Sequence, residues 1–171
     1  MSPTSKFLGV FDGVAPEQIR GEQGAHEVAW WRSLDGATWR GYFSGASSPS
    51  GLWTELTPIS SLQGASKLIT ARHHYVVETD IPQNAEAEFN AWYETEHLPG
   101  LARVPGTIIA RRFMRKTGGP RYLACYDLES PLVMERPEWL AIRQTPWSAR
   151  MRPMFMNTVR TLYVLGVEPT K

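Results

Sequence analysis

Several features that often identify a protein class are scarce in this sequence. Only one of its 171 residues is cysteine, Cys125, so no internal disulfide can form, and no Cys/His cluster has zinc-site spacing. The 18 Lys and Arg residues are balanced by 17 Asp and Glu residues, which leaves no basic excess for binding nucleic acid through its phosphates. No apolar run approaches the roughly 20 residues of a membrane-spanning helix. Secretory-signal and glycine-rich phosphate-loop patterns are also missing. We therefore expect a globular cytoplasmic protein with no metal site, no cofactor, and no nucleic acid or membrane partner.

The second half of the chain alternates between strand-like and helix-like segments. Its predicted strands are Ala71–Ile81, Gly106–Lys116, Arg121–Leu128 and Val159–Val167. A helix is predicted over Asn84–Leu98, ended by Pro99-Gly100. Ser130-Pro131 and Thr145-Pro146 each read as a helix cap followed by the first helical residue. The resulting order β-α-β-β-α-β is typical of a ferredoxin-like α+β domain, which we place at residues 71–171.

Residues 1–70 are less regular. Three short strand-like runs, with Asp35-Gly36 as a hairpin turn between the last two, cover Lys6–Val14, His26–Leu34 and Thr38–Ser44. Thr57-Pro58 is predicted to open a short helix. Thr57-Pro58 lies 88 positions before Thr145-Pro146 (145 − 57), and this and other short matches suggest a duplication. Residues 1–70 are therefore a reduced half, and whether they are a degenerate ferredoxin-like repeat stays open.

One stretch resembles a known family. The segment from Phe89 to Pro99, with its Trp-Tyr-x-x-Glu-His-x-Pro ending, resembles the EthD-like branch of the dimeric α/β-barrel superfamily. The Val104-Pro-Gly106 segment and the Arg121–Glu129 strand resemble it too. This resemblance implies ferredoxin-like units whose sheets pair face to face, across a dimer or between tandem copies. It also implies a cleft histidine at His97, and activities that range from cofactor-free monooxygenases to cyclases, isomerases, dehydratases and haem-handling enzymes.

The sheet of the second half needs a covering on both faces. In Arg121–Leu128 both alternating sets of side chains are bulky, so neither set is typical of a solvated face. A second sheet would bury the face that the helices leave open, and a cavity between the sheets is the expected place for a small molecule. The second sheet can come from residues 1–70 or from another chain. We favour a homodimer because residues 1–70 look too reduced to be a full partner.

The helix Asn84–Leu98 carries the principal catalytic candidates. At 100° per residue, Glu96 falls between Trp92 and Tyr93 on an aromatic arc, and His97 lies at the edge of that arc. A carboxylate on an apolar face has a raised pKa, whereas an imidazole near a helix C-terminus is favoured as the cation. His97 and Glu96 could thus form an acid–base pair near neutral pH, with Tyr93 orienting the imidazole. The alternative is structural: Glu96 bonds a backbone amide and His97 caps the helix.

Other candidates lie on the strands. His73 and His74 are neighbours on one strand and point to opposite faces, as do Arg111 and Arg112, and the pattern leaves open which of each pair faces the cavity. His74 is a further catalytic candidate, and Arg111 or Arg112 could bind a substrate carboxylate or enolate. Tyr126, Trp92 and Trp147 complete the predicted substrate-binding set.

These observations favour a small-molecule-binding α/β-barrel protein. Its leading function is cofactor-independent acid/base catalysis, of the isomerase, cyclase or dehydratase type, on an apolar, oxygenated molecule. A non-catalytic ligand-binding or interaction module is one alternative. A cofactor-free monooxygenase or haem-handling protein is another.

Overall fold

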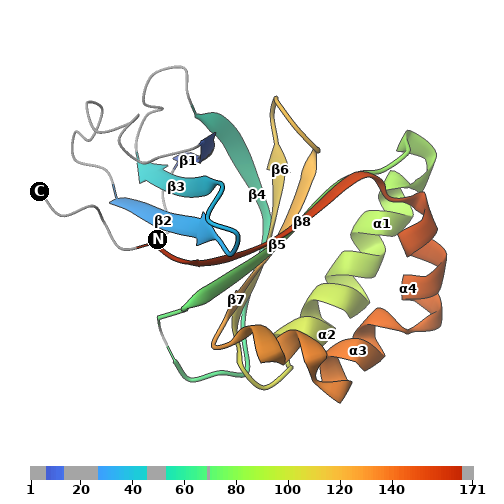
Figure 1. The fold of residues 1–171 in the computed structure, drawn as a ribbon. Coiled ribbons are helices and arrows are strands. Elements are labelled where there is room, and N and C mark those ends of the chain that lie inside the picture. Colours follow the sequence, from blue (N-terminus) through green and yellow to red (C-terminus); the bar gives the residue numbers. More distant parts are fainter. Residues whose placement is uncertain (1–6, 14–26, 46–52, 69, 167–171) are drawn as a thin grey trace, which may run out of the picture.

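The computed structural model describes residues 7–13, 27–45, 53–68 and 70–166. Its second half has the predicted β-α-β-β-α-β order (Figure 1). The four strands are β5 (His73–Asp80), β6 (Thr107–Arg115), β7 (Tyr122–Leu128) and β8 (Met156–Leu165). A glycine turn joins β6 to β7, and both Gly118 and Gly119 have a positive φ there. These four strands form a ferredoxin-like antiparallel sheet in the order β8-β5-β7-β6.

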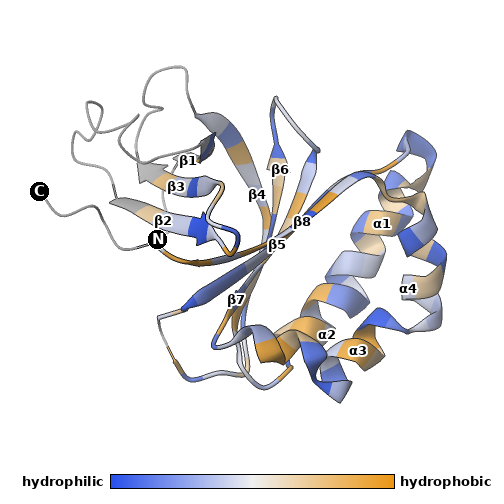
Figure 2. Cartoon of the chain, viewed as in Figure 1, coloured by the Kyte–Doolittle hydropathy of each residue, from blue (hydrophilic) through white to orange (hydrophobic). Residues whose placement is uncertain are grey.

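The helices of this half lie on one face of the sheet (Figure 1). The first helical region comprises η2 (Gln83–Ala85), α1 (Glu86–Trp92), a π-helical turn η3 (Tyr93–His97) and α2 (Leu98–Ala102). The second is divided into η4 (Pro131–Glu135), α3 (Pro137–Arg143), α4 (Pro146–Met151) and η5 (Arg152–Met154). Figure 2 shows hydrophobic residues of α2 beside those of α3. No helix in the described ranges is both long and apolar enough to cross a membrane.

Our prediction that Pro99-Gly100 ends the first helix is wrong. The chain stays helical to Ala102, with Pro99 in the first turn of α2. A proline in a helix lacks an N–H and crowds the carbonyl four residues earlier, here that of Thr95. The wider π turn Tyr93–His97 lies directly before Pro99 and contains Thr95, so the helical path loosens where the proline ring would clash.

The first half supplies four more strands, β1 (Phe7–Gly13), β2 (Glu27–Ser33), β3 (Trp39–Gly45) and β4 (Thr54–Gln63). The first three confirm the predicted runs, and the Asp35-Gly36 hairpin between β2 and β3 is confirmed as well. The helix predicted at Thr57-Pro58 is wrong, because both residues lie within β4. The register of β4 against β6 shifts between Pro58 and Ser60, and such a bulge is how a strand accommodates a residue without an N–H. Thr145-Pro146, its proposed repeat partner, does begin a helix.

The eight strands close into one antiparallel barrel within a single chain, in the order β1-β3-β2-β8-β5-β7-β6-β4. The first-half sheet meets the second-half sheet where β4 pairs with β6 and where the end of β2 pairs with the end of β8. This corrects our expectation that another chain would supply the partner sheet: residues 1–70 supply it. The homodimer itself stays a prediction, as does the division into units 1–70 and 71–171.

Side chains fill the interior of the barrel. An apolar cluster there includes Trp31, Val76, Phe113, Leu123 and Cys125. A second, larger core lies between the sheet and the helices and contains Phe89, Trp92, Leu101, Tyr126 and Trp139 among others. The second-half sheet is therefore buried on both faces, as its side-chain pattern predicted.

Candidate functional site

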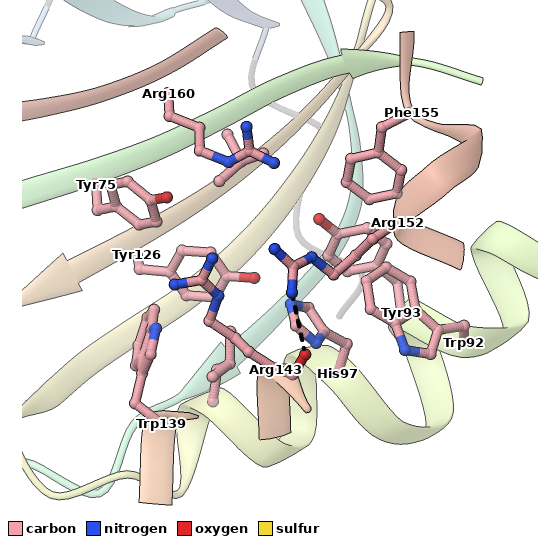
Figure 3. Close-up of a pocket in the computed structure, with 12 residues that line it drawn as sticks. Tyr75, Trp92, Tyr93, His97, Tyr126, Trp139, Arg143, Arg152, Phe155 and Arg160 are labelled. Atoms are coloured by element: carbon pink, nitrogen blue, oxygen red, sulfur yellow. Dashed lines mark hydrogen bonds between the residues drawn. The ribbon is translucent and has the colours of Figure 1, made fainter. Parts of the chain in front are cut away.

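A pocket lies between the second-half sheet and its helices, rather than between the two sheets as we expected (Figure 3). The pocket is partly open, and its empty space, counted together with the solvent at its mouth, is about 430 Å³. Between the two sheets, large side chains of the first half, Trp31 and Leu56 among them, pack into the barrel. The residues lining the pocket are Tyr75, Val77, Trp92, Tyr93, His97, Leu101, Tyr126, Trp139, Arg143, Arg152, Phe155 and Arg160.

The π turn brings His97 onto the aromatic face of its helix. In a regular α-helix, residues five apart lie about 140° apart around the axis and do not stack. Here the Leu98 N–H donates to the Tyr93 carbonyl five residues earlier, which widens the turn. As a result, the ring of His97 stacks on that of Trp92, with centroids 4.2 Å apart, and meets the edge of Tyr93 at 5.3 Å. The wheel that placed His97 at the edge of the arc assumed an α-helix throughout.

Glu96 contacts Trp92 and Thr145 instead of His97, the partner that we expected. Its Oε1 accepts hydrogen bonds from Trp92 Nε1 at 3.2 Å and from Thr145 Oγ1 at 2.6 Å. Thr145 is also the N-cap of α4, where its hydroxyl accepts from Ser148 N–H. No hydrogen bond joins Glu96 to His97 in the described part of the chain. Glu96 therefore fixes the Trp92 ring against which His97 stacks, and ties that ring to the start of α4.

His97 is a neutral imidazole at the base of the pocket. Burial, reinforced by the nearby Arg143, Arg152 and Arg112 cations, lowers the pKa of His97 to about 3. This overturns our expectation of a cation paired with Glu96 near neutral pH. The helix does not end at His97, so no set of free carbonyls favours the charged form there, and the charged neighbours that lower its pKa are cations. Among the described residues none hydrogen-bonds its buried Nδ1.

Two tyrosines, Tyr126 and Tyr93, are part of the pocket wall together with His97. Tyr126 comes from β7, and its buried Oη has no hydrogen-bond partner among the described residues. Figure 3 shows this hydroxyl pointing into the pocket. Burial raises the pKa of Tyr126 well above its usual value and that of Tyr93 to about 12. Both are therefore neutral phenols, able to donate a hydrogen bond to an oxygen atom of a ligand.

Arg112 lies behind Tyr93 and Arg111 lies on the opposite face of the sheet. The Arg112 side chain is buried against the helices, where Nη2 donates to Asn90 Oδ1 at 2.8 Å and the guanidinium lies 4.1 Å from the centre of the Tyr93 ring. Arg111 faces the barrel and pairs with Asp127 at 2.5 Å. Of this pair, Arg112 is the arginine on the side of the pocket.

His74 belongs to the barrel interior and is separated from the pocket by the sheet. Its Nδ1 lies 2.6 Å from Asp127 Oδ1, its Nε2 lies 2.9 Å from the Tyr42 hydroxyl, and its ring stacks on Trp31. Burial lowers the pKa of His74, opposed by the bond to Asp127. His73 points to the other face, the face of Tyr75. The structure does not bring His74 and His97 together.

Trp147 also lies away from the pocket. It lies in α4, and its Nε1 donates a hydrogen bond of 3.1 Å to Glu88 Oε1 in α1. This hydrogen bond links the two helices. Of the predicted site residues, the pocket wall contains His97, Tyr93, Trp92 and Tyr126. The wall also contains Tyr75, Trp139, Phe155 and three arginines that sequence reasoning missed. The sequence did carry a signal for Trp139, because Pro137 is a typical first residue of a helix that would contain this tryptophan. The sequence carried no such signal for the three arginines, because they come from separate elements.

Comparisons with known proteins identify the fold and nothing finer. No protein-family profile matches the chain, and no curated protein matches it in sequence. A ferredoxin-fold protein from Listeria monocytogenes, described as related to antibiotic biosynthesis monooxygenases, has a TM-score of 0.68 at 11% identity, over 95% of this chain and 96% of that one. A monooxygenase-like protein from Listeria innocua has a TM-score of 0.69 at 12% identity, over 96% and 95%. A haem-degrading enzyme from Listeria monocytogenes has a TM-score of 0.64 at 9% identity, over 94% and 100%.

These structures match 94–96% of the chain and not its second half alone. The eight-stranded arrangement, first half included, is therefore a recurring variant of the ferredoxin-like α+β fold. The predicted fold class is confirmed at that level. The EthD-like branch stays a prediction.

Proposed function

We propose that this chain binds a planar, apolar, oxygenated small molecule in the pocket between its sheet and helices, and that it acts on this molecule by cofactor-independent proton transfer. The observation that carries the proposal is that two buried polar atoms of the pocket, His97 Nδ1 and Tyr126 Oη, have no hydrogen-bond partner among the described residues. A buried polar atom left unpaired costs about 1–3 kcal/mol. In an aromatic-walled pocket, an oxygenated ligand is the natural partner for both.

The chemistry follows from the protonation states. His97 is unprotonated at neutral pH, and it can accept a proton from the ligand once negative charge on that ligand offsets the surrounding cations. Tyr126 and Tyr93 stay protonated and can donate hydrogen bonds to an oxygen on which negative charge develops. Isomerisation, cyclisation and dehydration that pass through an enolate can each use this combination of a base and hydrogen-bond donors. Glu96 is a positioning residue in this scheme, because it acts through Trp92.

Binding is tested with 2-naphthol and naphthalene, which share a planar ring and differ by one hydroxyl. Quenching of tryptophan fluorescence should report tighter binding of 2-naphthol, and Tyr126→Phe or His97→Phe should lower its affinity about two- to tenfold, the usual range for one hydrogen bond. Naphthalene binding should change little in either variant. Trp147→Phe, outside the pocket, is the control. If neither compound binds, or if the variants bind 2-naphthol as the wild type does, the proposal is wrong.

Catalysis is a separate question from binding. Native mass spectrometry of the protein as purified should reveal a retained small molecule, whose chemical class then selects substrates. Full turnover of such a substrate by His97→Phe would end the assignment of His97 as the base. A ligand that is bound and returned unchanged would instead identify the binding-module alternative.

Haem is a second candidate ligand because of the same imidazole. A buried neutral histidine in an aromatic pocket has the donor chemistry of a haem ligand, and the arginines at the mouth suit the two propionates. His97 would hold the iron, and Arg143, Arg152 and Arg160 would hold the carboxylates. Bound haem would supply redox chemistry with dioxygen. Adding haem should then shift the Soret band in the wild type and not in His97→Phe, and the absence of any shift would dispose of this candidate.

A further inference from the structure

The charged side chains that line the pocket are all of one sign. The whole chain has a formal net charge of only +1. The pocket lining nevertheless contains Arg143, Arg152 and Arg160 and no aspartate or glutamate. Arg112 adds a fourth cation close behind the wall, because it contacts the Tyr93 ring. A cleft lined by charges of one sign concentrates ions of the other sign.

Among the described residues, the three lining arginines have no carboxylate partner, in contrast to the arginines buried in the barrel. Arg40, Arg111 and Arg115 each lie within 4.0 Å of a carboxylate. Within the described ranges no ion pair involves Arg143, Arg152 or Arg160. Arg152 Nη1 instead donates to the backbone carbonyl of Arg143 at 3.5 Å, which holds the two arginines near each other.

Convergence distinguishes these arginines from ordinary solvated ones. They come from three elements, α3, η5 and β8, and Figure 3 shows Arg152 just above His97, Arg143 to the left of His97 beside Tyr126, and Arg160 higher in the view. All three cations also lie near enough to affect Tyr75. Burial raises the pKa of Tyr75, and each of the three arginines lowers it. Like charges held around one opening repel one another unless an anion lies between them.

We infer that Arg143, Arg152 and Arg160 form a carboxylate subsite at the mouth of the pocket, so that the ligands of this protein are planar aromatic acids. This inference rests on the proposed function and narrows its ligand class. Guanidinium groups are suited to carboxylates because their N–H groups match the two oxygens. When the carboxylate of such a ligand lies at the mouth, the aromatic ring of the ligand lies among Tyr126, Trp139 and Phe155. The far edge of that ring then faces His97.

The inference is tested with 2-naphthoate and 2-naphthamide, which have nearly the same shape and differ in charge. Isothermal titration at pH 8 and low ionic strength should show 2-naphthoate binding about tenfold more tightly, the size expected for charge-assisted hydrogen bonds that are partly exposed to water. Arg143→Gln and Arg152→Gln should each remove most of that difference. Both variants should bind 2-naphthamide within about twofold of the wild type, which also shows that the pocket is still folded.

Arg136→Gln is the matched control. Arg136 is exposed, does not line the pocket, and lies just before α3, so this variant makes the same change in net charge without touching the mouth. It should leave the affinity for both compounds unchanged. If it weakens 2-naphthoate as much as Arg143→Gln does, the effect is one of overall charge and the subsite is refuted.

The remaining outcomes separate the two proposals. Equal binding of 2-naphthoate and 2-naphthamide, unaffected by Arg143→Gln, refutes the carboxylate subsite and leaves the proposed function standing. Binding of neither compound, together with no binding of 2-naphthol, refutes the proposed function and the subsite with it.

Discussion

Replacing His97 with phenylalanine should flatten the dependence of stability on pH below neutrality. In the folded protein His97 has a pKa of about 3, against 6.5 for an unperturbed histidine. As the pH falls below 6.5, the unfolded chain takes up a proton at this position and the folded protein does not. Stability is therefore lost progressively from about pH 6.5 down to about pH 3, and above pH 6.5 this residue contributes no pH dependence.

The magnitude follows from the difference between the two pKa values. The gap of about 3.5 units (6.5 − 3) at about 1.4 kcal/mol per unit gives about 5 kcal/mol over the whole range. At pH 5 the unfolded state is almost fully protonated at this site, so the loss relative to pH 7.5 is about 2 kcal/mol. Phenylalanine keeps a ring to stack on Trp92 and has no proton to bind.

The assay is urea unfolding of both proteins at pH 7.5 and pH 5. The wild type should lose about 2 kcal/mol more of its unfolding free energy between these pH values than His97→Phe loses. His74 and the carboxylates titrate in both proteins, so their contributions cancel in this comparison. Equal losses in the two proteins would refute the argument, because they would mean that His97 takes up protons as readily in the folded state as in the unfolded one.

Three further predictions concern parts of the molecule around the site. Asp127→Asn should lower the unfolding free energy by about 2–3 kcal/mol, because it removes the charge that pairs with Arg111 and His74, and a loss under 0.5 kcal/mol in urea unfolding would contradict this. Glu96→Ala should cost about 1–2 kcal/mol and change the near-ultraviolet circular dichroism, since it frees Trp92 and Thr145, and an unchanged spectrum would show that Glu96 does not hold the Trp92 ring. Each chain should keep a cooperative unfolding transition at dilutions at which no dimer remains, because the barrel closes within one chain, and loss of that transition on hundredfold dilution would mean that folding requires a second copy.

Much of the fold could be predicted from local signals. Strands with bulky side chains on both faces, the Asp35-Gly36 turn and the Thr145-Pro146 cap each act over a few residues, and each is found where the sequence places it. Thr57-Pro58 carries the same local signal as Thr145-Pro146 and forms a strand instead. What decides between them is the partner: β4 lies between β1 and β6 and closes the barrel, a long-range pairing that no local pattern reports.

The candidate site shows the same limit at the scale of single side chains. The sequence identified the helix that carries His97. A regular helical wheel, however, placed Glu96 rather than His97 on the face of Trp92. The π turn before Pro99 exchanges Glu96 for His97 on the face of Trp92, and that exchange replaces a carboxylate with an imidazole at the base of the pocket. The proline was visible in the sequence, but whether a helix stops or loosens at a proline depends on what it packs against.

The same exchange explains why the positive charge of the pocket lining is balanced only when an anionic ligand binds. Had Glu96 faced the pocket, its carboxylate would have offset the arginines, and His97 would have had a counter-ion. Instead Glu96 is engaged with Trp92 and Thr145, and the charges that act on His97 are those of Arg143, Arg152 and Arg112. A weak base in a field of cations is suited to act only when an anion enters, because the anion offsets that field at the moment the substrate arrives. The neutral His97 and the unpaired arginines are thus two consequences of one feature, a pocket whose negative charge is supplied by its ligand.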